Sequence, residues 1–396
     1  MTKGKWCTRA ISVTIALSFI LGGLVVAPSV SADPGTSQWE KQATPTEKDL
    51  VILPGSDIID MAVGGSDGKT IYAIGVWYDV CGTETDDEWA QESGPWDLFS
   101  VYHHPKLWRS TDGGVTWKDR TSKVTGATNL PDLGDDWGNG VAQNFAFFTT
   151  VAVAPDDPDF VVVGGWGWAD AENRDLDGRA YVPVVVGSND GADKFYWMGC
   201  GNAVGFITAL DVSMEVSGKH NIAVGTWDPE VYGPAYATQN AKVWRFEAGS
   251  YWSASWVDTS TYGTNWKASD LICDLKFSPN FDVDDTIVVL SAGPVADTQD
   301  IGPYYKGYWL QAGCWGNLKL WNAEGGYGSH PVLIDRDSDC IVAPIDPQIG
   351  SGWDDIGELA RRCGHIALPS DYMGDASSGR RVMVAVNGLL FQRDNT

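Results

Sequence analysis

The sequence of 396 residues predicts an all-β protein built from repeated antiparallel strand pairs. Two observations support this fold class. A short alternating strand, a polar turn and a second strand ending near glycine recur five times along the chain. The composition, with 46 glycines, 20 tryptophans and 20% charged residues, is too apolar for a disordered chain and too rich in glycine and tryptophan for a helical bundle.

The beginning of the chain has the three regions of a secretory signal peptide. Basic residues within the first nine positions precede an apolar run over residues 11–26, and small residues follow at 30–32. The apolar run is shorter than the roughly 20 residues of a membrane span. We therefore expect a signal peptide over residues 1–32. The mature domain, residues 33–396, is expected to be secreted or held at the cell surface and not integral to the membrane.

The repeated strand pairs follow the signal. In each copy, alternating apolar residues flank a turn rich in Ser, Pro, Asp or Gly, which is typical of two antiparallel strands. The five copies occupy residues 58–76, 148–165, 206–226, 271–293 and 366–388. Long connections separate them, chiefly at residues 77–104, 294–317 and 334–362. Long loops on a rigid scaffold usually carry function, so we expect a ligand site there.

A second motif follows the first strand pair. It places Ser110, Asp112, Gly114, Thr116 and Trp117 at fixed spacing. The aspartate can accept hydrogen bonds from its own turn, the glycine permits a positive φ, and the tryptophan is expected to be buried between sheets. This motif resembles the Asp-box, a repeat of bacterial neuraminidases. Weaker copies occupy residues 188–197, 243–256 and 320–327.

The resemblance to the Asp-box superfamily covers about residues 39–396. That superfamily includes sialidases, sortilin, xyloglucan-active glycosidases and a photosystem II assembly factor. It implies a β-propeller of four-stranded antiparallel blades, of which this chain holds about five. Such blades bury both faces of each sheet against their neighbours, which accounts for many tryptophans without a ligand. The Asp-box turn is structural in this superfamily, so Asp112 is not expected to be catalytic.

The last residues of the chain leave two arrangements open. Residues 390–396 align with residues 108–114 and stop before the closing tryptophan of the motif. We expect that the sequence is truncated from a larger propeller of seven or more blades. The alternative is a closed ring of five blades, in which residues 37–46 supply the missing outer strand of the last blade.

Six cysteines follow the predicted signal peptide. None forms a Cys-x-x-Cys pair, so nothing indicates a zinc ribbon or a thioredoxin-like site. An even number in an exported chain favours disulfides, with free buried thiols as the alternative. The six are Cys81, Cys200, Cys273, Cys314, Cys340 and Cys363.

Calcium is the one candidate cofactor. Asn173, Asp175 and Asp177 alternate before a glycine, as in the first half of an EF-hand-like loop, although Val184 stands where the bidentate glutamate is expected. Asp282 and Asp284 form a second acidic turn. Both segments are predicted calcium ligands, with plain solvated turns as the alternative.

Catalytic residues are not singled out by spacing. The mature chain opens with no Arg-x-Pro motif of the sialidase kind, and its acidity would repel an anionic sugar. Among 52 acidic residues, no pair stands out as the carboxylates of a glycosidase. Aromatic residues outside the clear strands are candidates for stacking on sugars, with packing between blades as the alternative: Trp89, Trp96, Trp137, Trp166 and Trp168.

A net charge of −25 excludes nucleic acid as a natural partner, because phosphate binding needs a basic face. We predict an exported, non-catalytic propeller that binds an extracellular protein or polysaccharide, or assists assembly at the cell surface. Two alternatives remain. One is a glycoside hydrolase with loop carboxylates at the propeller mouth, and the other is a structural component of a surface layer.

Overall fold

The computed structural model describes fifteen stretches of the chain, all within the compact unit Ala43–Thr396. They are residues 57–78, 103–130, 147–169, 180–200, 206–227, 241–249, 255–259, 269, 271–294, 306–314, 326–327, 332–333, 364–374, 381–386 and 389–394. The predicted signal peptide lies outside them. No helix in these stretches is long and apolar enough to cross a membrane.

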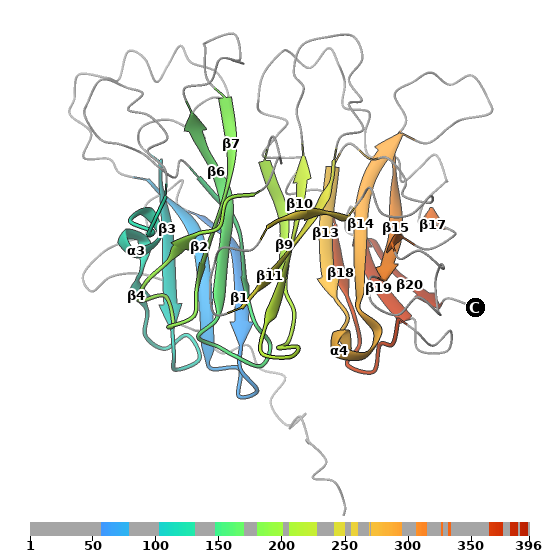
Figure 1. Cartoon of the computed structure of the whole chain (residues 1–396), viewed down its shortest axis with the longest axis horizontal. Helices are drawn as coiled ribbons and strands as arrows, with labels where there is room; N and C mark the ends of the chain where they lie inside the picture. Colours follow the sequence, from blue (N-terminus) through green and yellow to red (C-terminus); the bar gives the residue numbers. More distant parts are fainter. Residues whose placement is uncertain are drawn as a thin grey trace, which may run out of the picture. The chain divides into compact units, whose positions relative to one another are not determined.

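The described residues form antiparallel sheets that follow one another along the chain, which we call blades 1 to 5 (Figure 1). Blade 1 contains β1 (Asp57–Gly64), β2 (Thr70–Tyr78), β3 (His103–Ser110) and β4 (Lys118–Asp119). Blade 2 contains β5 (Phe147–Val153), β6 (Val161–Ala169), β7 (Ala180–Ser188) and β8 (Tyr196–Trp197). Blade 3 contains β9 (Phe206–Val212), β10 (His220–Trp227), β11 (Val243–Ala248) and β12 (Val257–Asp258).

Blade 4 contains β13 (Leu271–Phe277), β14 (Thr286–Pro294) and β15 (Lys306–Cys314), with β16 (Gly326–Tyr327) and β17 (Val332–Leu333) both paired to β15. Blade 5 contains β18 (His365–Ala367), β19 (Arg381–Val386) and β20 (Leu389–Asp394). One bridge, from Trp227 to Leu271, joins blades 3 and 4. Two short helices, α3 (Thr121–Thr125) and α4 (Phe281–Asp284), complete the described structure.

The first strand of each blade, which we call its inner strand, contacts the inner strand of the next blade. This succession runs through β1, β5, β9, β13 and β18. Blades that pack face to face in chain order, inner strand beside inner strand, define a β-propeller. The predicted all-β fold of four-stranded antiparallel blades is therefore confirmed, and the five predicted strand pairs are all present. Blade 5 has three strands within the described residues.

The hydrophobic core lies in layers between neighbouring blades. Between blades 1 and 2, Tyr72 and Ile74 pack with Phe148 and Val184. Similar layers separate blades 2 and 3, blades 3 and 4, and blades 4 and 5. Because both faces of a blade are covered, the strands read as nearly continuous apolar runs such as Val161–Val163, all of them fully buried.

The inner strands share a repeated bond to the next blade. Four of them have a β-bulge at the same place in the strand, and in blades 2 and 3 the extra residue is threonine. The hydroxyl of Thr149 donates to the carbonyl oxygen of Ile207 at 2.6 Å, and that of Thr208 donates to Ile272 at 2.7 Å. A bulge re-aims one side chain, and here it turns a hydroxyl toward the neighbouring blade.

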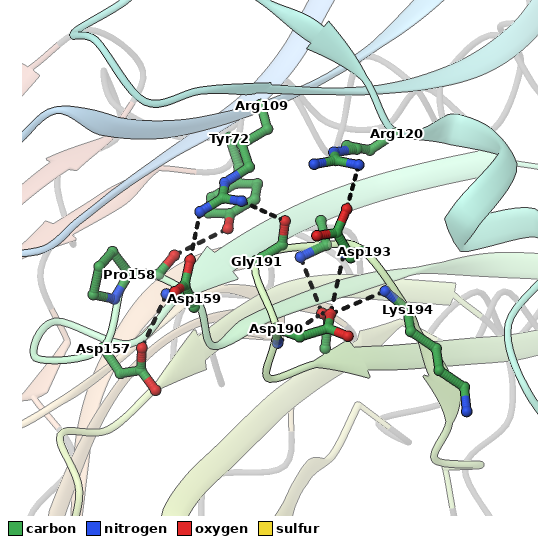
Figure 2. Close-up of polar contacts among 12 residues, drawn as sticks. Tyr72, Arg109, Arg120, Asp157, Pro158, Asp159, Asp190, Gly191, Asp193 and Lys194 are labelled. Atoms are coloured by element: carbon green, nitrogen blue, oxygen red, sulfur yellow. Dashed lines mark hydrogen bonds and ion pairs between the residues drawn. The ribbon is translucent and has the colours of Figure 1, made fainter.

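Blades 1 and 2 are also joined by polar contacts near their turns (Figure 2). The hydroxyl of Tyr72 donates to the carbonyl oxygen of Pro158 at 2.9 Å, and Arg109 pairs with Asp159 and Gly191. Arg120 forms an ion pair with Asp193 at 2.6 Å. Side chains from β2, β3 and the residue before α3 thus hold two turns of blade 2.

The turn of the Ser110 motif lies between β3 and β4. Asp112 accepts hydrogen bonds from the hydroxyl of Ser110 (2.8 Å), the amide of Thr116 (2.8 Å) and the hydroxyl of Thr116 (2.6 Å). Gly113 and Gly114 have positive φ, as expected for this turn. Trp117 is only partly buried, and its indole N–H donates to Gly114 at 3.1 Å. The expectation that this ring is buried between sheets is therefore corrected.

A matching turn joins β7 and β8 in blade 2. Asp190 accepts hydrogen bonds from Ser188 (2.8 Å) and from the amide of Lys194 (2.9 Å). Ala192 has a φ of 65° where the first turn has Gly114. The two turns therefore share the hydrogen bonds of their aspartates, but they do not share a glycine at every position.

Cysteines occur in two chemical states. Cys273 is disulfide-bonded, and Cys200 is a free, buried thiol whose pKa burial raises above its usual range. The described part of the chain thus contains both a disulfide-bonded cysteine and a free buried thiol, the two alternatives that the sequence left open.

Candidate functional site

The residues predicted to stack on sugars are mostly outside the described structure. Trp89, Trp96 and Trp137 lie there, and Trp168 is described only as a β6 position paired with Tyr181. The structure corrects the expectation for Trp166, which is 3% exposed. Its ring stacks on Phe147 at 6.1 Å and meets Phe206 edge-on at 5.5 Å. Trp166 is therefore a packing residue between blades 2 and 3.

Of the two predicted calcium segments, Asn173, Asp175 and Asp177 lie outside the described residues. Asp282 and Asp284 are in α4. The buried carboxylate of Asp284 accepts hydrogen bonds from the hydroxyl of Ser278 (2.6 Å), the amide of Thr286 (3.0 Å) and the amide of Gly374 (2.6 Å).

Asp284 thus joins blade 4 to the turn of blade 5, a role that sequence reasoning did not foresee. In the described stretches, no group of three or more His, Cys, Asp or Glu side chains is arranged to hold a metal ion.

A group of charged side chains on the inner strands was missed by sequence reasoning. We call it the inner-strand cluster. It comprises residues of β1, β9, β13 and β18: Asp60, Asp211, Asp274, Lys276 and His365. The three aspartates and the lysine each lie within a largely apolar strand, and these charged positions are the signal that was available in the sequence.

Lys276 is the centre of this cluster. Its ammonium nitrogen lies 3.6 Å from a carboxylate oxygen of Asp211 and 3.8 Å from one of Asp274. It also attracts Asp60 electrostatically. The side chain of Lys276 is 37% exposed, while those of Asp211 and Asp274 are 20% and 11% exposed. One partly exposed lysine side chain therefore places its ammonium between two largely covered carboxylates.

Each carboxylate of the cluster is also anchored to the next blade. Asp60 accepts the amide of Val151 at 2.9 Å, and Asp211 accepts that of Phe277 at 2.8 Å. Asp274 accepts the amide of Ile366 at 2.8 Å. In all three cases, the partner is a backbone amide of the neighbouring inner strand. The carboxylates are thus held in fixed positions.

Burial and charge act on these groups in opposite directions. Burial raises the pKa of Asp60 and of Asp211 above the usual value of 3.8, even though Lys276 opposes the shift. The carboxylate of Asp211 is the main reason that the pKa of Lys276 is raised above its usual range. Lys276 is therefore cationic at neutral pH.

The inner-strand cluster lies on the first strands of the blades. Each of these strands begins at the edge of its blade where the antiparallel second strand ends. Trp227 at the end of β10 is opposite Phe206 at the start of β9, and Val76 near the end of β2 is opposite Asp57. The connection over residues 77–104, where function was expected, therefore leaves the sheet at the starting end of the inner strands.

Comparisons with known proteins give distant likenesses to solved structures. No family model matches the chain, and no curated protein matches it either. Among solved structures, it is similar to an α-L-arabinofuranosidase from Fusarium graminearum at 12% identity and a TM-score of 0.39, over 85% of this chain and 77% of that one. The chain is also similar to an α-L-arabinanase from Penicillium chrysogenum, with 10% sequence identity and a TM-score of 0.37, over 85% of this chain and 78% of that one.

A thermostable family-43 glycoside hydrolase gives 10% identity and a TM-score of 0.33, over 86% of this chain and 95% of that one. Likenesses this distant define neither a substrate nor a reaction. The strands and the cluster define the class of protein: a β-propeller whose inner strands carry a charged site.

Proposed function

We propose that this chain is a carbohydrate-active β-propeller that hydrolyses a glycosidic bond at the inner-strand cluster. One observation carries the proposal. Oxygens of Asp211 and Asp274 both lie within 4 Å of the ammonium of Lys276. They are therefore within about 8 Å of each other, which is compatible with the separations of roughly 5–9.5 Å at which carboxyl pairs hydrolyse glycosides.

The two carboxyl groups have different surroundings. Burial raises the pKa of Asp211, which is the direction that suits the carboxyl that protonates the departing glycosidic oxygen. Asp274 lies between two basic side chains, with Lys276 at 3.8 Å and His365 at 3.7 Å. We therefore assign Asp274, which lies beside both basic side chains, to the opposite side of the bond.

Hydrolysis of neutral polysaccharides tests this proposal. The purified chain is incubated with arabinan, xylan, xyloglucan and β-glucan, and release of reducing sugar is measured. Asp211→Asn and Asp274→Asn are each expected to lower the rate by about 10²–10⁴-fold. Asparagine keeps an oxygen that can accept the anchoring amide hydrogen bond, so both variants should remain folded. Asp282→Asn, an exposed position on α4, is the matched control.

A non-catalytic binding module is the second candidate. The observation in its favour is that the amide bonds to Val151, Phe277 and Ile366 give the carboxylates a structural role of their own. If this candidate is correct, the wild-type chain binds a polysaccharide or protein with no turnover. The two asparagine variants then lower the melting temperature more than they change binding.

The setting of this activity is part of the proposal. The signal-like residues 1–32 support export, and extracellular polysaccharide is then the natural partner. The shared hydrogen bonds of the Ser110 and Ser188 turns support placing the chain in the Asp-box superfamily. N-terminal sequencing of the mature protein tests export, since it should begin after Ala32.

A further inference from the structure

His365 is the most exposed member of the inner-strand cluster. It is the first residue of β18, and its side chain is 85% exposed. Its neighbour Ile366 donates to Asp274, just as Val151 in blade 2 donates to Asp60 of blade 1. His365 therefore occupies the position that Thr150 holds in blade 2, where the hydroxyl bonds to Asp60 at 3.0 Å.

The imidazole has a defined orientation toward the cluster. Its Nδ1 lies 3.7 Å from the Asp274 oxygen that also accepts the Ile366 amide. A carboxylate beside Nδ1 favours a proton on that nitrogen, so Nε2 is the ring nitrogen left for other contacts. A largely exposed imidazole beside an anchored carboxylate is placed to contact a ligand hydroxyl.

We propose that His365 contacts the sugar bound at the inner-strand cluster through Nε2, and that this contact makes binding depend on pH. This inference rests on the proposed function. A protonated Nε2–H donates a charge-assisted hydrogen bond to a sugar hydroxyl. When the ring is neutral, with its proton on Nδ1, the same Nε2 only accepts. Binding should therefore weaken as His365 loses its proton.

The charges that face His365 come from two other blades. Asp274 raises the pKa of His365 above 6.5 through its close polar contact at 3.7 Å and its negative charge. Asp60 of blade 1 also raises it, while Lys276 of blade 4 and partial burial oppose the shift. The change in binding is therefore expected at a higher pH than for an ordinary histidine.

Histidine NMR provides the direct test on the full chain, because the sequence contains only five histidines. The His365 ring signal is assigned by its loss in His365→Gln, and it is titrated with pH with and without arabinotetraose, xylotetraose or cellotetraose. A bound probe should shift this signal and its apparent pKa. The signal of His220, which is 6% exposed between blades 2 and 3, serves as the internal reference.

Affinity measurements complete the test. His365→Gln should weaken probe binding about 10–100-fold at pH 6, from the loss of one charge-assisted hydrogen bond of about 1.5–3 kcal/mol. Its affinity should also no longer change above pH 6.5. Asp274→Asn should return the pKa of His365 toward its usual value.

The outcomes separate the two proposals. A probe that binds and shifts other signals, but leaves His365 and the pH dependence of binding unchanged, overturns this inference and leaves the proposed function intact. If none of the three probes changes any signal, the site does not bind these sugars and both proposals are overturned.

Discussion

The guanidinium of Arg109 in blade 1 donates a hydrogen bond of 2.7 Å to the carbonyl oxygen of Gly191 in blade 2. It also pairs with Asp159, just before the second strand of that blade (Figure 2). Arg245 holds the same position in blade 3 and interacts with Asp285, just before β14 of blade 4. In two pairs of neighbouring blades, an arginine at this position thus attracts an aspartate of the next blade electrostatically.

Replacing Arg109 should weaken the contact between blades 1 and 2. We expect Arg109→Met to lower the free energy of unfolding by about 2–3 kcal/mol, because it removes hydrogen bonds from a charged donor and leaves the Gly191 carbonyl without that partner. Urea denaturation followed by tryptophan fluorescence measures the change.

Two variants show which part of this contact matters. Asp159→Asn removes only the charge of a half-exposed partner and should cost less than about 1 kcal/mol. Lys123→Met, on the exposed surface of α3, should have almost no effect. An Arg109→Met variant as stable as wild type would show that the hydrogen bond to Gly191 contributes nothing.

Close packing between blades 3 and 4 depends on Gly225. A Cβ at this position would collide with the side chain of Ile272 on the next inner strand. We therefore expect Gly225→Ala to destabilise the protein by about 1–3 kcal/mol through overpacking. Thermal and urea unfolding measure the loss.

The double variant Gly225→Ala with Ile272→Ala identifies the cause. If steric conflict is responsible, the two changes together cost less than the sum of their separate effects. Gly249→Ala is the matched control, because a Cβ there lies 3.6 Å or more from its neighbours. Strict additivity of the two substitutions would argue against overpacking.

The sequence predicted the repeated part of this fold well. Alternating residues and turn signals located all five strand pairs, because their formation depends on residues close together in the chain. The turn around Asp112 was also foreseen, since every hydrogen bond it makes is to residues within four positions.

The candidate site could not be predicted in the same way. Asp211 and Lys276 lie on inner strands of different blades, and only the packing of β9 beside β13 brings them together. Trp166 was misjudged for a related reason. Its place near the end of a strand suggested exposure, but rings from β5 and β9 cover it. The surroundings of these residues are set by contacts between blades, and the sequence of a single strand does not show those contacts.

Trp117 should contribute less to stability than a buried tryptophan does. Its ring is partly exposed and its indole nitrogen bonds to Gly114 of its own turn. We expect Trp117→Ala to cost about 1–2 kcal/mol, from partial loss of apolar burial and one hydrogen bond. Trp108→Ala, at a position 2% exposed, should cost about 3–5 kcal/mol. Equal losses in urea denaturation would contradict this ranking.

Asp112 should make the stability of the protein depend on pH in the acid range. Hydrogen bonds from Thr116 and Ser110 lower the pKa of its carboxyl from 3.8 to about 2. A group with a lowered folded-state pKa stabilises the protein above its unfolded pKa. That contribution is lost as the pH falls from 3.8 toward 2.

Asp112→Asn removes the titrating group, so the variant should lose less stability than wild type between these two pH values. Melting temperatures recorded from pH 5 to pH 2 provide the comparison. Asp282→Asn, at an exposed position of α4, controls for the loss of one negative charge. If the melting temperatures of wild type and Asp112→Asn fall equally as the pH is lowered, the carboxylate is not held by its turn in solution. The hydrogen bonds that define this turn would then contribute little to folding.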